Sequence, residues 1–227
     1  MSKIMLAPSV MVGNLLDIKG DLKEIAKTDA DMLHIDMMDP TMTKVTGLPN
    51  ALIPELRKAS DLPLDIHIAS HMPESYLQSI LPNCEGCYVS VHIETTDSFF
   101  WIADMIRKAG AKPGVALNSS TPASAIEEIL PAVDMVMILT FDAGRALNVP
   151  GVKECVCHKV EEIKHMCLVA GRPDIVIECD GGITFEDTKL FRSYGADTFV
   201  LGRDSVYAQP EPLSDKIKEL RAYLDEQ

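Results

Sequence analysis

Two histidines and two aspartates in this chain have the types and positions that a metal-binding site needs. His34 and Asp36 stand two residues apart in a short apolar run, while His67 and Asp180 lie at the ends of two similar runs. Because side chains alternate along a β-strand, His34 and Asp36 point to the same face. Two imidazoles with two carboxylates suit a divalent transition metal such as zinc, manganese, iron or cobalt. Each residue taken alone is also explained as an ordinary polar residue at a strand end.

Alternating apolar runs and helical segments must position these residues. The predicted strands lie near residues 4–8, 32–37, 64–68, 87–93, 113–117, 133–139, 174–179 and 197–201. The predicted helices span residues 15–28, 50–59, 73–80, 97–109, 122–130, 152–170, 184–194 and 211–225. Such alternation in 227 residues predicts one α/β domain over residues 1–227, a closed (β/α)8 TIM barrel. A doubly wound open sheet is the competing arrangement.

The barrel prediction places all four residues at the carboxyl ends of strands, where the active sites of this fold form. Asp36 would follow the second strand and Asp180 the seventh, so that their carboxylates face each other across the mouth of the barrel. Two opposed carboxylates can remove a proton from one face of a carbon and return it to the other. A divalent metal would stabilise the negative charge that develops on neighbouring oxygens. The sequence thus predicts an epimerase with Asp36 and Asp180 as its catalytic acid and base.

Glycines after the last two predicted strands indicate an anion site. Gly181 and Gly182 form a turn that leads into a helix, and Gly202-Arg203 follows the last strand. Backbone amides at such a turn bind anions, and phosphate sites at these positions are common in this fold. A glycine pair alone is also explained as a simple turn. Its position beside Asp180 favours phosphate.

The composition argues against several classes of partner. The chain carries 34 acidic and 21 basic residues, a formal charge of -13, which speaks against nucleic acid and anionic membranes. No apolar run reaches transmembrane length, and the first residues lack the features of a signal peptide, so we expect a cytoplasmic protein. The six cysteines are irregularly spaced, which is typical of reduced thiols.

Beyond these patterns, the chain resembles the ribulose-phosphate 3-epimerase family along nearly its whole length. The stretches that carry the resemblance, in order and spacing, are residues 7–9, 33–39, 62–67, 90–94, 114–118 and 178–183. The resemblance implies a TIM barrel of the ribulose-phosphate-binding type that inverts a ketose phosphate at C3 and uses one divalent metal ion. It also implies a homo-oligomer, a dimer or a hexamer.

The resemblance further implies roles for individual residues. The metal ligands would be His34, Asp36, His67 and Asp180. The two aspartates among them would form the acid and base pair. Ser9 would bind a substrate hydroxyl, Met38 and His67 would line the pocket, and the amides of Gly181 and Gly182 would hold the phosphate.

Several loops depart from the family pattern. Residues 40–45 read Pro-Thr-Met-Thr-Lys-Val where the family usually has Gly-His-Phe-Val-Pro-Asn, and Ala69 replaces a bulkier residue two positions after His67. Of the glycine-rich phosphate loop after the sixth strand, only Gly144 remains, and the charge of Asp142 would oppose a phosphate. The chemistry therefore looks retained while the substrate specificity does not.

Two arginines offer a replacement for the missing phosphate contacts. Arg145 lies in the altered loop, and Arg203 follows Gly202 where the family usually has serine or threonine. Guanidinium groups bind phosphate through two parallel hydrogen bonds. Solvent exposure, or pairing with Asp142 and Asp204, explains the two arginines equally well.

Three readings of the function remain open at this stage. The first is a ketose-phosphate 3-epimerase that acts on ribulose 5-phosphate and xylulose 5-phosphate, or on a related ketose phosphate such as allulose 6-phosphate. The second, an aldolase or decarboxylase, lacks the Asp-x-Lys-x-x-Asp strand motif of that group, because His67 follows Asp65-Ile66. The third is a non-catalytic sugar-phosphate-binding barrel.

His92 and Glu94 lie two residues apart and share a strand face. Two explanations fit them equally well: they extend the polar site, or His92 is a histidine packed at a strand end.

Overall fold

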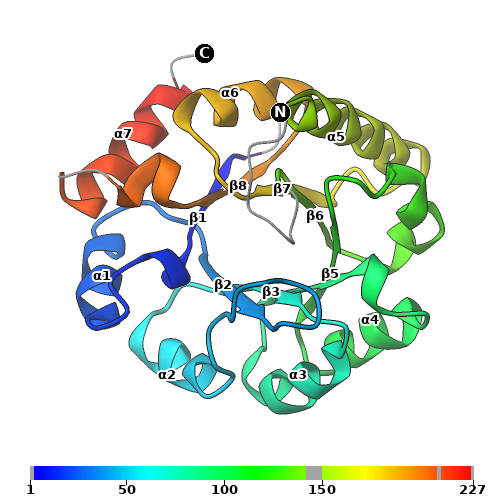
Figure 1. The fold of residues 1–227 in the computed structure, drawn as a ribbon, viewed down its shortest axis with the longest axis horizontal. Coiled ribbons are helices and arrows are strands. Elements are labelled where there is room, and N and C mark those ends of the chain that lie inside the picture. Colours follow the sequence, from blue (N-terminus) through cyan, green and yellow to red (C-terminus); the bar gives the residue numbers. More distant parts are fainter. Residues whose placement is uncertain (1–2, 142–149, 209–210, 226–227) are drawn as a thin grey trace.

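Eight parallel strands form the wall of a barrel in the computed structural model, which describes residues 3–141, 150–208 and 211–225 (Figure 1). The strands are β1 (Met5–Pro8), β2 (Leu33–Met38), β3 (Leu64–Ala69), β4 (Tyr88–His92), β5 (Lys112–Leu117), β6 (Met135–Leu139), β7 (Val176–Asp180) and β8 (Thr198–Leu201). Their order is β1-β8-β7-β6-β5-β4-β3-β2. A bridge between Ser9 and His34 joins the β1 and β2 edges, so the barrel is nearly closed. The predicted TIM barrel is confirmed.

Helical segments surround the strands, and each strand is followed by at least one of them (Figure 1). The α-helices are α1 (Ile18–Ile25), α2 (Leu52–Ala59), α3 (Pro73–Ile80), α4 (Phe99–Lys108), α5 (Val152–Val169), α6 (Phe185–Tyr194) and α7 (Leu213–Asp225). Shorter segments are the 3-10 helices η1 (Val10–Val12), η2 (Leu81–Asn83) and η3 (Ile93–Thr95), and the π-helix η5 (Arg203–Tyr207). The helix predicted after β5 is a 3-10 helix, η4 (Ala123–Ala132), in which Pro131 has no N–H to close the last turn.

Capping side chains decide where two of the helices begin. Helix α1 is shorter than the sequence predicted, because the Asp17 side chain accepts a hydrogen bond from the amide of Gly20 and caps the helix there. At α6, Thr184 and Asp187 form a reciprocal capping box, and Gly195 ends the helix in the left-handed conformation. The capping box therefore fixes the point at which the turn after β7 ends and α6 begins.

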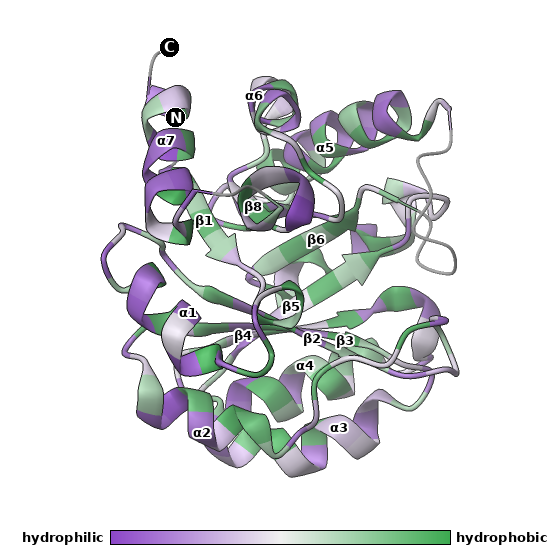
Figure 2. Cartoon of the chain, turned by 60° about the vertical axis from the view of Figure 1, so that its left-hand side comes forward, coloured by the Kyte–Doolittle hydropathy of each residue, from purple (hydrophilic) through white to green (hydrophobic). Residues whose placement is uncertain are grey.

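Strand side chains alternate between the outer face of the barrel, which the helices cover, and its interior, which holds an apolar cluster and a polar site. Ile35 lies on the outer face, in the main hydrophobic core with helix residues such as Leu56. Figure 2 shows hydrophobic residues on the strands and hydrophilic residues on outer helix faces. Side chains of the other parity point into the barrel, where Ala7, Met32 and Met135 form a separate apolar cluster. No helix within the described ranges is long and apolar enough to cross a membrane.

Gly114 on β5 has no room for a side chain inside the barrel. A Cβ there would lie 2.1 Å from Oγ and 3.1 Å from Cβ of Ser90, its register partner on β4. We expect Gly114→Ala to lower the free energy of unfolding by about 1–3 kcal/mol through overpacking, measured by urea denaturation. In a Ser90→Gly background the same substitution should cost much less. Equal costs in both backgrounds would contradict the clash.

Candidate active site at the carboxyl ends of the strands

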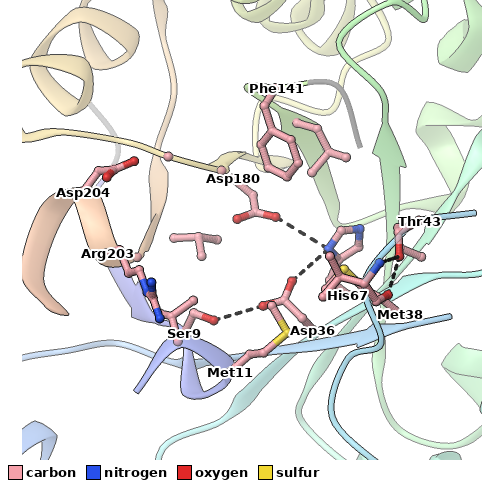
Figure 3. A pocket seen from close by; sticks show the side chains of 18 residues that line it. Ser9, Met11, Asp36, Met38, Thr43, His67, Phe141, Asp180, Arg203 and Asp204 are labelled. Carbon is pink, nitrogen blue, oxygen red and sulfur yellow. Dashed lines mark hydrogen bonds and ion pairs between the residues drawn. The ribbon is translucent and has the colours of Figure 1, made fainter. Parts of the chain in front are cut away.

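The carboxyl ends of the strands surround a pocket of about 370 Å³ (Figure 3). Nine residues that the sequence assigned to the site line this pocket. They are Ser9, Asp36, Met38, His67, Asp180, Gly181, Gly182, Gly202 and Arg203. His34 is fully buried and precedes Asp36 by two residues on β2. Gly144 and Arg145, together with Asp142, lie outside the described residues, so their roles stay predictions.

Four side chains from three strands converge at one side of the pocket. One nitrogen or oxygen atom from each of His34, Asp36, His67 and Asp180 lies within 4.8 Å of the others. Nε2 of His34 is 3.2 Å from Oδ1 of Asp36 and 3.9 Å from Oδ2 of Asp180. Nδ1 of His67 is 3.5 Å from that Asp36 oxygen and 3.6 Å from that Asp180 oxygen. We call these four residues the metal-ligand cluster.

The second nitrogen of His34 is held by Asp65, a buried aspartate inside the barrel. Nδ1 of His34 lies 2.5 Å from Oδ2 of Asp65, which leaves Nε2 to face the cluster. Glu178 lies next to Asp65 and is fully buried. Burial and the negative charge of Asp65 raise the pKa of Glu178 well above its usual range. A neutral Glu178 avoids placing an unpaired negative charge beside Asp65.

The second nitrogen of His67 is held by a different group. Nε2 of His67 lies 2.9 Å from Nε2 of His92, and Nδ1 of His92 lies 3.0 Å from Oε2 of Glu94. Burial lowers the pKa of His92 to about 4. Burial opposes ionisation of Glu94, but hydrogen bonds from His92 and Thr121 lower its pKa to about 2. At neutral pH, Glu94 is therefore a carboxylate beside a neutral imidazole.

The two aspartates of the cluster differ in their affinity for a proton. Burial opposes ionisation of Asp36, but the positive charge and the hydrogen bond of His34 hold its pKa well below the usual range. Ser9 also donates a hydrogen bond to Asp36, at 3.0 Å. Burial raises the pKa of Asp180 to about 6, and the negative charge of Asp36 acts in the same direction. The pair thus combines a strongly ionised carboxylate with one that holds a proton more readily.

The cluster fits a divalent metal ion because it brings four possible ligand atoms, two imidazole nitrogens and two carboxylate oxygens, together in a buried position. Nδ1 of His67 is buried and has no hydrogen-bond partner among the described residues. Burial opposes a charge on His34, but the negative charges of Asp36, Asp65 and Asp180 outweigh it and raise its pKa. The site therefore attracts positive charge, which a proton or a metal cation supplies. Two imidazole nitrogens and two carboxylate oxygens suit zinc, manganese, iron or cobalt.

The glycine turn after β7 lies at the other side of the pocket. Gly181 has a φ of 112°, and a Cβ there would lie 1.9 Å from the ring of Phe141, so the position requires glycine. A Cβ on Gly182 would lie 3.2 Å from Oδ2 of Asp204. The exposed Arg203 also lines the pocket and makes no ion pair with Asp204. An anion at this turn would therefore meet one cation and one carboxylate.

Sequence reasoning missed several residues of the site and its surroundings. The pocket wall includes the apolar side chains of Met11 and Phe141, for which the sequence gives no signal before the loops are placed. Asp65 and Glu178 were detectable, because a period of two puts them on the same faces as His67 and Asp180. The role of these buried acids in holding His34 depends on contacts between strands.

Comparison with known proteins identifies the family to which the chain is similar. The model of the "Ribulose-phosphate 3 epimerase family" matches residues 5–206. The ribulose-phosphate 3-epimerase of Mycobacterium leprae is 33% identical over 214 residues, which cover 92% of this chain and 90% of the relative. That of Bacillus subtilis is 30% identical over 210 residues, covering 92% of this chain and 94% of the relative.

Similarity to solved structures is more distant. A variant of the tryptophan synthase α-subunit from Pyrococcus furiosus aligns with a TM-score of 0.67 and 13% identity, covering all of both chains. The tryptophan synthase α-subunit from Campylobacter jejuni aligns with a TM-score of 0.63 and 15% identity over 96% of each chain. These likenesses show the barrel fold alone. The family match and the curated relatives carry more: this chain belongs to the ribulose-phosphate 3-epimerase family and is an isomerase, an epimerase acting on carbohydrates.

Proposed function

We propose that this chain is a metal-dependent ketose-phosphate 3-epimerase that moves a proton between two carboxylates. The observation that carries the proposal is the position of Asp36 and Asp180, which approach the pocket from β2 and β7 on either side of His67 (Figure 3). Nδ1 of His67 is almost equally distant from the two, at 3.5 Å and 3.6 Å. A carbon held between them would meet a carboxylate on each face.

The different proton affinities of the aspartates support this division of labour. In one direction the ionised Asp36 removes the C3 proton while Asp180 delivers a proton to the opposite face. In the other direction the roles reverse. A divalent metal held by the cluster would stabilise the negative charge on the substrate oxygens. A purely sugar-phosphate-binding barrel would have no use for two such carboxylates, so we favour the enzyme over this alternative.

The phosphate of the substrate would bind at the turn after β7. The amides of Gly181 and Gly182 and the guanidinium of Arg203 are the donors available there, whereas Asp204 opposes an anion. The name of the Bacillus subtilis relative specifies ribulose phosphate, and the name of a chloroplastic relative from Arabidopsis thaliana specifies ribulose 5-phosphate, whose C3 epimer is xylulose 5-phosphate. Ala69 on the pocket wall leaves room for a larger ketose phosphate such as allulose 6-phosphate.

Deuterium incorporation tests the proposed reaction. Metal-loaded protein should exchange the C3 proton of at least one ketose phosphate in deuterated water and form the C3 epimer, followed by NMR. Asp180→Asn should reduce formation of the C3 epimer by about 10²–10⁴-fold, because an amide cannot deliver or remove a proton on that face of the substrate. Its metal content must be measured alongside, since the amide oxygen remains a possible ligand.

A charge-matched variant controls this experiment. Asp104→Asn also removes one carboxylate, but Asp104 is exposed on α4 and pairs with Lys108. This variant should exchange at the wild-type rate. Epimer formation at the wild-type rate by metal-loaded Asp180→Asn, or no exchange by the wild type on any of the ketose phosphates, would rule out the two-carboxylate reaction.

Metal removal should affect both activity and stability. Stripping the protein with a chelator should abolish exchange and lower the melting temperature, because a ligand at 100 times its Kd stabilises the fold by about 2.7 kcal/mol. Returning one equivalent of manganese, cobalt or zinc should restore both. Full exchange by protein that elemental analysis shows to be metal-free would contradict a metal-dependent reaction.

The two charged residues beside the glycine turn should affect substrate binding in opposite directions. Arg203→Met should raise KM by about tenfold or more, because a hydrogen bond to a charged group contributes about 1.5–3 kcal/mol. Asp204→Asn should lower KM, since it removes a negative charge close to Gly182. Steady-state kinetics would show both effects, with kcat little changed. Unchanged KM in both variants would place the phosphate elsewhere.

A further inference from the structure

A line of buried polar contacts runs from His67 away from the pocket. Nε2 of His67 contacts Nε2 of His92 at 2.9 Å, and Nδ1 of His92 contacts Oε2 of Glu94 at 3.0 Å. The other oxygen of Glu94 accepts hydrogen bonds from the amide of Asn118, at 2.8 Å, and from the hydroxyl of Thr121. His92 is fully buried and His67 is 2% exposed. Water therefore has little access to the two rings.

The chemistry of these atoms determines which atom donates and which accepts in each contact. The backbone N–H of Asn118 can only donate, so Oε1 of Glu94 must accept. Two donors at Oε1 favour the ionised form of Glu94, so its Oε2 also accepts, and Nδ1 of His92 carries the proton between them. A neutral imidazole then has a bare Nε2, which accepts from Nε2–H of His67. The remaining nitrogen of His67, Nδ1, is left with a free lone pair.

We propose that Glu94 and His92 are positioning residues that keep the ring proton of His67 on Nε2, so that the Nδ1 lone pair faces the metal-ligand cluster. The opposite tautomer would place an N–H between the two aspartates and repel a cation. This inference rests on the proposed function only in that the lone pair serves a metal. The tautomer itself is a property of the metal-free protein.

The other histidine of the cluster is oriented by the same principle through its opposite nitrogen. Nδ1 of His34 faces Asp65, which leaves Nε2 for the cluster, whereas His67 offers Nδ1. A metal-binding histidine commonly donates its second N–H to a carboxylate or carbonyl, which fixes the tautomer. For His67 the carboxylate acts through an intervening imidazole.

The turn after β5 anchors the far end of this line. Nζ of Lys159 on α5 donates to the carbonyls of Asn118 and Ser119, at 2.8 Å and 2.9 Å. These contacts hold the turn so that the Asn118 amide points at Glu94. The orientation of His67 therefore depends on residues from β3, β4, the β5 turn and α5.

Glu94→Gln tests the proposal, because a glutamine amide can donate to His92 as well as accept from it. Long-range ¹⁵N–¹H NMR of the metal-free wild type should show His67 protonated on Nε2, while Glu94→Gln should populate the Nδ1-protonated form. Cobalt affinity, measured by competition with a chelator, should fall about 10–100-fold. Glu127→Gln, on an exposed face of η4, is the matched control and should change neither.

Two substitutions of His92 separate polarity from packing. In His92→Gln the amide nitrogen can donate to Glu94 while the carbonyl accepts from His67, so the tautomer of His67 and the cobalt affinity should be retained. Adding Glu94→Gln to this variant should cost less affinity than Glu94→Gln alone costs. His92→Leu removes the acceptor and should lose affinity like Glu94→Gln.

Each readout has an outcome that would overturn the proposal. Nδ1 protonation of His67 in the metal-free wild type would refute it, as would equal cobalt affinities for Glu94→Gln and Glu127→Gln. Equal losses in His92→Gln and His92→Leu would reduce His92 to a packing role. None of these readouts uses turnover, so failure of the epimerase reaction and failure of this inference are distinguishable.

Discussion

Four possible metal ligands, two imidazole nitrogens and two carboxylate oxygens, face one buried region between β2, β3 and β7, and the rest of the structure is arranged around them. Nε2 of His34, Nδ1 of His67 and one oxygen from each of Asp36 and Asp180 lie within 4.8 Å of one another. Such a group is unstable without positive charge, since buried like charges repel strongly at low dielectric. Parallel strands suit this task, because their carboxyl ends meet at one rim.

The groups that orient the two histidines of the cluster lie deep in the barrel. Each histidine of the cluster has its second nitrogen engaged, His34 by Asp65 and His67 by His92. Those partners are themselves buried, so they need partners in turn, which Glu94 supplies for His92. A polar layer therefore lies beneath the pocket, while an apolar cluster fills another part of the barrel interior. Precision at the site is obtained at the cost of burying several ionisable groups.

The sequence predicted the parts of this arrangement that follow from local rules. Period-two alternation and turn signals were enough to place Asp36 and Asp180 at strand ends, and eight repeats were enough to predict a barrel. The contact between His67 and His92 was not predictable, because His67 pairs in register with Ser90 and the rings meet only through the stagger of β3 and β4. Likewise, the approach of Asp204 to Gly182 depends on how two loops fold toward each other.

Charge limits what could hold the phosphate of the proposed substrate at the glycine turn. A divalent cation would offset the charges of Asp36 and Asp180, and Arg203 offsets Asp204, so the described pocket gains little net positive potential in a chain of charge -13. Long-range attraction therefore contributes little to phosphate binding. In the proposed reaction, short-range donors would have to hold the phosphate, and the backbone amides of Gly181 and Gly182 would provide them without any required side chain. Side chains around that turn would then be free to change with the length of the sugar, while every member of the metal-ligand cluster is constrained by the others.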